Sequence, residues 1–341
     1  MSCPGPTAPA AHALSASYYA DRATWCSAEI TGHAQIARDT YRLRFRAPQI
    51  AERIAPGQFV MLRLAGFDDP LLGRALALFD IATNAAGEPT DVEVVYMVVG
   101  KMTRRLTAFR PGQKLEAWGP LGNGFPEVET DHLIMVAGGV GITPFLAVAK
   151  QYREVGGSRL EVRNTSPGVE SESPTSNLQA PTSSSRLTLC YGARSADYFA
   201  ALDEFAKVGV DLQLSTDDGS RGHHGRVTEV LAKVLSEAGA EGVPSNPESR
   251  IPTLARISEP LTSNLQPLVF CCGPEPMMEA AAKVCADAGV PCFVSLETPM
   301  ACGVGICFTC VAKVRQSDGE WDYKRTCVEG PVFDARRIVW H

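Results

Sequence analysis

The stretch HLIMVAGGVGITPFLAVAKQYREV, residues 132–155, decides the fold class of this chain. It begins with a continuous apolar run, which is typical of a strand buried on both faces of a sheet. A glycine-rich turn follows, and then a helical segment. The same order recurs at 186–208 and at 267–289. Apolar strands that alternate with helices predict a Rossmann-like parallel sheet covered on both faces.

The residues before this sheet have a different pattern. Short alternating runs such as TYRLRF (40–45), GQFVMLRL (57–64) and DVEVVYMVV (91–99) are separated by Pro and Gly. This pattern predicts an antiparallel barrel or sandwich. The chain is therefore a multidomain β plus α/β protein, with a β-barrel over 25–127 and an α/β domain over 128–296.

Three segments have little capacity to build a core. Residues 1–24 are rich in Ala, Pro and Ser and predict a flexible leader. Residues 161–185 and 242–266 are rich in Ser, Pro and Asn, and both contain the pentapeptide TSNLQ. We expect these two segments to be surface insertions in the α/β domain.

Composition excludes several classes of protein. A net charge of −6 argues against a nucleic-acid binder, which usually carries a basic face. No apolar run approaches the roughly 18 residues of a membrane helix, and the amino terminus does not resemble a signal peptide. The 11 cysteines of a chain without such a signal indicate a reducing compartment, so we expect a cytoplasmic protein.

A group of cysteines near the carboxyl end predicts an iron–sulfur centre. Cys302, Cys307 and Cys310 lie in the segment MACGVGICFTC, and Cys327 follows in YKRTCVEGP. This is the plant-type spacing of a [2Fe–2S] cluster. Gly303 and Gly305 allow the close approach and positive φ that a loop around a cluster needs. A zinc site is the alternative, but zinc ribbons usually show two C-x-x-C pairs and only one occurs here.

Glycine-rich turns follow the predicted parallel strands, at the edge where open α/β sheets bind ligands. Turns of this kind let a phosphate approach a helix amino terminus. In the segments VAGGVGITP (136–144) and CCGPEPMM (271–278), the candidate nucleotide-binding residues are Gly138, Gly139, Gly141, Thr143, Pro144, Gly273 and Pro274. Asp217 and Asp218 favour NAD over NADP because they would repel a 2′-phosphate, whereas nearby Arg221 leaves NADP open.

Together these motifs resemble a known family. The order of barrel and α/β domain, with GGVGITP, YGARS and CGPEPM, is similar to the ferredoxin–NADP reductase superfamily. SLETPMACGVGICFTCVAKV, YKRTCVEGPVFDARRIVW and PGQKLEAWGPLGNGF resemble the electron-transfer subunit of the heterodimer-type dihydroorotate dehydrogenase. The resemblance extends from about residue 25 to the carboxyl end, apart from the two insertions.

The resemblance implies three cofactors and one partner. The barrel would bind FAD, the α/β domain NAD, and a small loop domain over 297–341 the [2Fe–2S] cluster. Electrons would pass from a catalytic subunit that carries FMN, through the cluster, singly to FAD and as hydride to NAD⁺, in pyrimidine biosynthesis. Two such heterodimers would form a heterotetramer. No catalytic residue for dihydroorotate oxidation is expected in this chain.

The resemblance also assigns a flavin site, with two departures from the family pattern. The candidate contacts are Arg74, Ala75, Leu76, Ala77, Val95, Tyr96, Met97, Met102 and Thr103. The family reads Arg-Pro-x-Ser where this chain has Ala75 and Ala77, so a hydroxyl near the flavin is missing. Met102 replaces a turn glycine. From its sequence pattern alone, Arg74 is also compatible with an ordinary surface arginine.

Two alternative functions stay open at this point. The chain could be the flavin and iron–sulfur subunit of another NAD(P)H oxidoreductase, linked to ferredoxin or sulfide. Such relatives have an aspartate where Cys302 stands, which favours the dihydroorotate branch. Alternatively, the altered flavin motif could mark a non-catalytic redox sensor that carries only the cluster.

Overall fold

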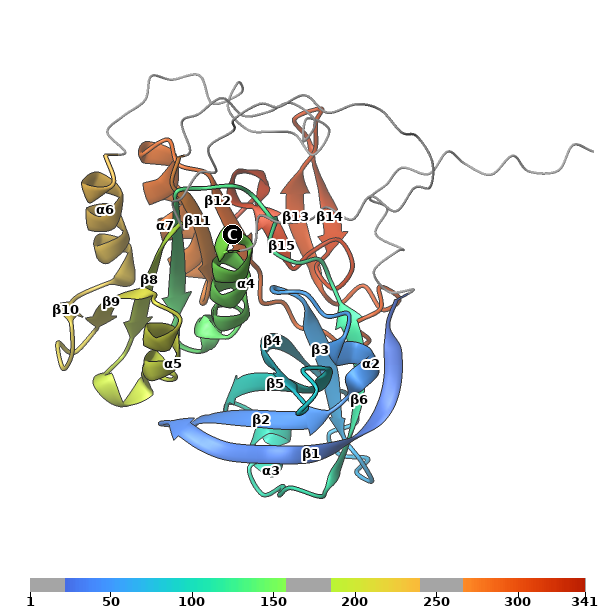
Figure 1. The fold of residues 1–341 in the computed structure, drawn as a ribbon. Helices are drawn as coiled ribbons and strands as arrows, with labels where there is room; N and C mark the ends of the chain where they lie inside the picture. Colours follow the sequence, from blue (N-terminus) through green and yellow to red (C-terminus); the bar gives the residue numbers. More distant parts are fainter. Residues whose placement is uncertain (1–21, 158–184, 240–265, 341) are drawn as a thin grey trace, which may run out of the picture.

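The protein has a β-barrel, an α/β sheet and a small carboxyl-terminal segment between them (Figure 1). The computed structural model describes residues 22–157, 185–239 and 266–340. The predicted leader and the two predicted insertions fall almost entirely outside the described residues.

The amino-terminal part is a closed antiparallel barrel with strand order β1-β2-β5-β4-β3-β6. Its strands are β1 (Thr24–Ala37), β2 (Thr40–Arg46), β3 (Phe59–Leu64), β4 (Arg74–Thr83), β5 (Pro89–Met97) and β6 (Lys114–Leu121), with helices α2 (Pro48–Ala51) and α3 (Lys101–Leu106). Alternate residues such as Leu43 and Phe45 fill the barrel interior. The predicted barrel is confirmed, and the sandwich alternative is wrong.

The second part is a seven-stranded sheet with the order β10-β9-β8-β7-β11-β12-β15. Its strands are β7 (His132–Gly138), β8 (Arg186–Ala193), β9 (Asp211–Thr216), β10 (His223–His224), β11 (Leu268–Cys272), β12 (Cys292–Ser295) and β15 (Val332–Asp334). All neighbouring pairs are parallel except β12 with β15. The predicted parallel sheet is therefore confirmed, with one antiparallel edge strand added.

Helices cover both faces of this sheet, as the apolar strands require. They are α4 (Phe145–Gly157), α5 (Leu202–Lys207), α6 (Val227–Glu237) and α7 (Glu275–Asp287), with short 3-10 turns η1 (Gly139–Ile142) and η2 (Ala196–Tyr198). In β7, Leu133 and Met135 pack in the core that includes α4 and α5. Ile134 and Val136 point the other way, into the core formed with α6 and α7.

One predicted helix is shorter than its pattern indicates. The pattern of 198–208 predicts a continuous helix, but α5 begins only at Leu202. Ala201 adopts a positive φ of 58°, and the Phe199 side chain is buried with its ring centroid 4.9 Å from that of Tyr191. Packing of this aromatic pair thus replaces the first helical turn.

The carboxyl-terminal segment joins the two larger parts. It contains the hairpin β13 (Val311–Arg315) and β14 (Trp321–Arg325), then β15 and the turn η4 (Ala335–Arg337). Because β15 pairs with β12, this segment completes the large sheet. Within the described ranges, no helix is both long and apolar enough to cross a membrane.

Candidate functional site

The cysteine loop folds as the glycine pattern predicts. Gly303 and Gly305 have φ angles of 74° and 81°, in the left-handed region that favours glycine. A Cβ at Gly303 would lie 2.6 Å from Met61 Cγ on the barrel, and one at Gly305 would lie 2.5 Å from Val328 Cγ2. Both glycines are therefore required, Gly303 for the loop to pack against the barrel and Gly305 for it to pack against Val328.

The four predicted cluster cysteines come together in two pairs. The thiols of Cys302 and Cys307 interact, as do those of Cys310 and Cys327. Cys310 and Cys327 are buried, Cys302 is half-buried and Cys307 is exposed. The backbone N–H of Val304 points at Cys302 Sγ, 3.4 Å away. Two thiol pairs from one loop and one following segment suit a cluster with two irons.

The pKa values of two of the four thiols are lowered, whereas the hydrogen bond with Cys310 raises the pKa of Cys327. Hydrogen bonds with Thr309 lower the pKa of Cys307 to about 6. The hydrogen bond from the Cys327 thiol lowers the pKa of Cys310 to about 6. The thiolate is the form that binds metal. Among the residues that the structure describes, no three or more His, Cys, Asp or Glu side chains are grouped to hold a single metal ion.

The cysteine loop is fixed to the barrel by apolar packing and by hydrogen bonds. Cys310 and Cys327 are buried in one apolar cluster with Phe59, Met61 and Leu121 of the barrel. Trp118 Nε1 donates to the carbonyl of Cys302 at 2.9 Å. This hydrogen bond joins β6 directly to a predicted cluster ligand.

A second link joins the end of the barrel to the carboxyl-terminal segment. Asn123 Nδ2 donates to the Val332 carbonyl at 2.8 Å, and Asn123 Oδ1 accepts from the Val332 N–H at 2.9 Å. The sequence alone indicates neither Trp118 nor Asn123 as a site residue, because their partners lie 184 and 209 positions away. Their segment, PGQKLEAWGPLGNGF, carries only a resemblance to the family.

Trp118→Phe is expected to make the cluster more labile, because it removes one hydrogen bond from the loop and keeps the ring. A lost hydrogen bond of about 1 kcal/mol corresponds to about fivefold faster loss of iron. The measurement is the rate of iron release to a chelator. Trp25→Phe is the control, since Trp25 is exposed and has no described hydrogen bond to the loop. Equal rates for both variants would contradict the proposed link.

The predicted flavin residues lie on two adjacent barrel strands and on α3. Ala75, Leu76 and Ala77 belong to β4, where Ala75 pairs with Met61 and Ala77 with Phe59. Ala75 also packs against the apolar cluster that contains Cys310 and Cys327. The predicted flavin segment and the cysteine cluster thus share one wall of the barrel.

The side chains of the other predicted flavin residues point in different directions. Arg74 is exposed, and its Nη1 donates to the Gly73 carbonyl at 2.9 Å. On β5, Val95 packs in the core of the α/β sheet, whereas the hydroxyl of Tyr96 is buried and lies 2.9 Å from His33 Nε2. Met97 reaches toward the glycine turn, with its Cε 4.0 Å from a Cβ placed on Gly139. The Tyr96 hydroxyl is therefore committed to the barrel interior.

The turn before α3 keeps its shape despite the methionine. Met102 lies within α3, and its side chain is buried in the barrel core. Thr103 Oγ1 accepts from the N–H groups of Val99 and Gly100, both at 3.1 Å. Thr103 therefore closes the turn, and a glycine is not needed at position 102.

The predicted nucleotide residues converge at the carboxyl ends of β7 and β11, which are adjacent parallel strands. A Cβ on Gly273 would lie 2.9 Å from the backbone nitrogen of Gly138, and a methyl group on Gly141 would overlap the Cys272 carbonyl. Thr143 is buried in front of α4, and Pro144 follows it. Pro274 is the N-cap residue of α7. The two glycine turns therefore pack directly against each other.

Two aspartates after β9 have different environments. Asp218 Oδ1 accepts from the N–H and the hydroxyl of Ser220, at 2.9 and 2.5 Å, and these bonds lower the pKa of Asp218. Asp217 is exposed beside it. Asp218 thus shapes the turn, which leaves the Asp217 carboxylate available at the edge of the sheet.

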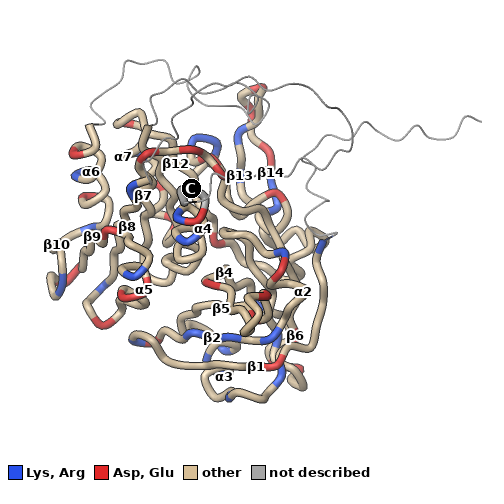
Figure 2. The backbone as a smooth tube through the Cα atoms, in the orientation of Figure 1, with Lys and Arg blue, Asp and Glu red and all other residues tan. Residues whose placement is uncertain are grey.

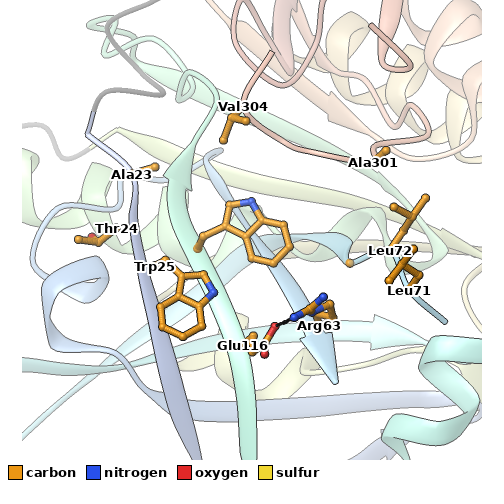
Figure 3. Close-up of a pocket in the computed structure, with 11 residues that line it drawn as sticks. Ala23, Thr24, Trp25, Arg63, Leu71, Leu72, Glu116, Ala301 and Val304 are labelled. Carbon is orange, nitrogen blue, oxygen red and sulfur yellow. Dashed lines mark hydrogen bonds and ion pairs between the residues drawn. The ribbon is translucent and has the colours of Figure 1, made fainter. Parts of the chain in front are cut away.

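A cleft of about 510 Å³ opens between the barrel and the cysteine loop. Figure 3 shows Trp25 and Leu71 on its walls, with the ion pair of Arg63 and Glu116 between barrel strands. Ala301 and Val304 of the cysteine loop line the other side, as do Ala23, Thr24, Leu72, Gly73 and Trp118. None of the predicted site residues lines this cleft.

Family models match two parts of the chain. Residues 27–125 match the oxidoreductase FAD-binding domain, and residues 297–339 match the iron–sulfur cluster binding domain of dihydroorotate dehydrogenase B. The cofactors predicted for these two parts, FAD and an iron–sulfur cluster, are therefore confirmed. A redox sensor without a flavin is correspondingly disfavoured.

Similar proteins cover nearly the whole chain. The dihydroorotate dehydrogenase B (NAD(+)) electron transfer subunit of Geobacillus kaustophilus is 33% identical over 307 residues, which are 89% of this chain and 94% of that protein. The corresponding subunit of Geobacillus thermodenitrificans is 31% identical over 91% of this chain and 96% of its own length.

A solved structure has the same fold over most of the chain. A chain of the NADH-dependent reduced ferredoxin–NADP oxidoreductase aligns with a TM-score of 0.65 and 26% identity, over 92% of this chain and 90% of that one. The resemblance noted in the sequence is thus confirmed at the level of both sequence and fold. This chain belongs to the family of dihydroorotate dehydrogenase B electron transfer subunits.

Proposed function

We propose that this chain carries electrons from a catalytic dihydroorotate dehydrogenase subunit to NAD⁺. One observation carries the proposal: Cys310 and Cys327 belong to the same apolar cluster against which Ala75 of the predicted flavin segment packs. This packing would hold a one-electron site and a flavin site side by side. The partner subunit would contain FMN and oxidise dihydroorotate.

The bound groups would supply the redox chemistry: the cluster exchanges single electrons, and the flavin converts them into a two-electron transfer to the nicotinamide. The residues of this chain position and shield those groups. Cys302, Cys307, Cys310 and Cys327 would ligate the cluster. Phe59, Met61 and Leu121, which are buried in the same apolar cluster as Cys310 and Cys327, would keep water from its inner side.

The flavin would lie along Arg74–Ala77 and the end of β5. The exposed Arg74 guanidinium is available for the pyrophosphate, to which it could donate charge-assisted hydrogen bonds. Ala75 and Ala77 offer no hydroxyl, so backbone groups or water would have to bond the flavin ring. Met97, which reaches Gly139, would place the ring next to the nucleotide turn.

The nucleotide would bind across the carboxyl ends of β7 and β11, at the glycine turns. The available Asp217 carboxylate suits the ribose hydroxyls of NAD and would repel the 2′-phosphate of NADP. This residue-level assignment supports NAD as the acceptor.

Arg74→Ala is expected to weaken FAD retention. A hydrogen bond to a charged group contributes about 1.5–3 kcal/mol, so the dissociation constant should rise about tenfold or more. The measurement is flavin content after gel filtration, with Arg53→Ala as the control. Arg53 is also an exposed barrel arginine, but its guanidinium bonds Gln49 and Thr24. Unchanged flavin content in Arg74→Ala would remove Arg74 from the site.

The decisive test of the function is an anaerobic absorbance spectrum of the purified chain, with flavin, iron and sulfide analysis, before and after addition of NADH. We expect one FAD and one [2Fe–2S] cluster per chain, both bleached by NADH. Iron without flavin would contradict the proposal and support the redox sensor. Bleaching by NADPH but not by NADH would contradict the assignment of NAD.

Three further features belong to this proposal. The chain would divide into a leader (1–24), a flavin domain (25–127), an NAD domain (128–296) and a cluster domain (297–341).

Two heterodimers with the catalytic subunit would form a heterotetramer, which light scattering of the co-purified complex would test. A cytoplasmic location is supported by the 11 cysteines, which a reducing compartment keeps as thiols.

A further inference from the structure

We infer that Arg42 is a positioning residue, which holds the α/β sheet in register with the barrel so that the flavin and the nucleotide can meet. The inference rests on the proposed function. Arg42 lies on β2 of the barrel, and its Nη2 forms an ion pair with Glu204 of α5. This contact joins the two larger parts of the chain across 162 positions. Neither residue belongs to a predicted cofactor site.

Two further ion pairs cross the same boundary. Arg38 Nη1, in the turn between β1 and β2, lies 3.2 Å from Asp197 Oδ2 of η2. Lys150 Nζ of α4 lies 2.5 Å from Asp80 Oδ2 of β4. The helices α4 and α5 face the barrel (Figure 1), and charged residues of both signs lie along this boundary (Figure 2). Opposite charges therefore join the two parts at several separate points.

The surroundings of Arg42 within the barrel direct its side chain toward α5. Its Cζ lies over the ring of Phe79, 4.9 Å from the ring centroid, and its Nε lies 3.5 Å from Glu93 Oε2. Glu93 already accepts a hydrogen bond from Arg44 Nε at 2.6 Å. The Nε of Arg42 is buried and makes no hydrogen bond to any described residue, which is unfavourable. This cost is explained if the contact with Glu204 has a function.

The neighbouring contact of Arg38 reaches the predicted nucleotide edge. The segment YGARS (191–195) ends at the carboxyl end of β8, and η2 follows it directly. Besides its ion pair, the Arg38 backbone N–H donates to the Asp197 carbonyl at 2.8 Å. The Arg38 guanidinium also lies 5.2 Å from the ring centroid of Tyr198. The barrel thereby holds the segment that borders the nucleotide edge.

The other side of the boundary carries the predicted flavin segment. Residues 74–77 belong to β4, the same strand that contributes Phe79 and Asp80 to the boundary. Phe79 and Val95 are buried in the core of the α/β sheet. Hydride transfer requires the reacting atoms to lie about 3–3.5 Å apart, and a misplacement of about 1 Å can cost about 100-fold in rate. A small shift at the boundary would therefore slow the reaction without removing either cofactor.

The first test is the limiting rate of flavin reduction by NADH in the purified chain loaded with FAD. In Glu204→Ala this rate should fall about tenfold or more, since the register of the two parts is lost. Flavin content and the dissociation constant for NADH should not change, because Glu204 lies outside both predicted sites. Glu204→Gln keeps a hydrogen bond to Arg42 without the charge, so it should restore part of the rate.

The second test needs no bound cofactor. The Arg38 N–H bonds the Asp197 carbonyl across the boundary, so its hydrogen exchange reports whether the two parts stay in contact. In Glu204→Ala it should exchange about fivefold faster or more, as loss of one hydrogen bond gives. Asp203→Ala is the matched control, since Asp203 is exposed beside Glu204 on α5 and forms no ion pair in the described ranges. It should leave both measurements unchanged.

Three outcomes would overturn the inference. Equal exchange at Arg38 in the wild-type chain and in Glu204→Ala would show that Glu204 does not hold the two parts together. A raised dissociation constant for NADH with an unchanged limiting rate would place Glu204 in the nucleotide site. A slower rate in Asp203→Ala as well would show a general effect of charge on α5. A wild-type chain that NADH does not reduce would contradict the proposed function, and the exchange measurement would still decide whether Glu204 holds the boundary.

Discussion

Cys307→Ser is expected to abolish the [2Fe–2S] cluster and electron transfer from the catalytic subunit. Cys307 is the exposed member of the thiol pair with Cys302, and its pKa is lowered to about 6 by Thr309, so it would be a thiolate at neutral pH. A serine hydroxyl does not ionise in this range. Loss of a second-shell partner already costs about 10–100-fold in metal affinity, so loss of a ligand should cost at least that.

Two measurements separate the cluster from the flavin in this variant. Iron content and the rate of dihydroorotate-dependent NAD⁺ reduction should both fall about 100-fold or more. NADH oxidation by an artificial dye should persist, because the predicted flavin and nucleotide residues lie outside the cysteine loop. Cys26→Ser is the matched control, since Cys26 is a free thiol on β1, outside the loop. If dye reduction vanished equally, the cluster would be essential to folding or to the flavin site.

Local patterns were enough to predict most of the fold. Apolar runs such as 132–138 and 268–272 follow directly from burial on both sheet faces, and the alternating runs of β2, β3 and β5 follow from barrel packing. β15 has no such pattern, because it spans only Val332–Asp334 and is defined by its pairing with β12. Its place could not be predicted from a local sequence.

The candidate site likewise combines features that neighbouring residues determine with features that depend on contacts between distant segments. The spacing of the cysteines predicted a cluster because the ligands of the loop lie close together in the chain. The role of Trp118 depends on a hydrogen bond to Cys302 across 184 positions, and the role of Arg42 depends on an ion pair with Glu204 across 162. Contacts of this kind follow from tertiary packing alone. The departures at Ala75 and Met102 were visible in the sequence, but only the structure shows that both side chains pack in apolar surroundings.

Gly141→Ala is expected to destabilise the α/β domain and weaken NADH binding. The sequence indicates Gly141 as a residue that lets a phosphate approach, and the structure gives a second reason for glycine. An added methyl group would overlap the Cys272 carbonyl, which is backbone and cannot rotate away. Relief would require β7 and β11 to separate at their carboxyl ends, where both nucleotide turns lie. Overpacking of this kind costs about 1–3 kcal/mol.

The measurement is chemical unfolding followed by NADH titration of the folded variant. We expect a lower free energy of unfolding and a higher dissociation constant for NADH. Gly32→Ala is the matched control, because its added methyl group would lie 3.5 Å from Arg44 Cβ, an ordinary contact on the barrel. If Gly141→Ala kept its stability and lost only NADH binding, the glycine would serve the phosphate. If it lost stability and the remaining folded protein bound NADH normally, packing against Cys272 would be its whole function.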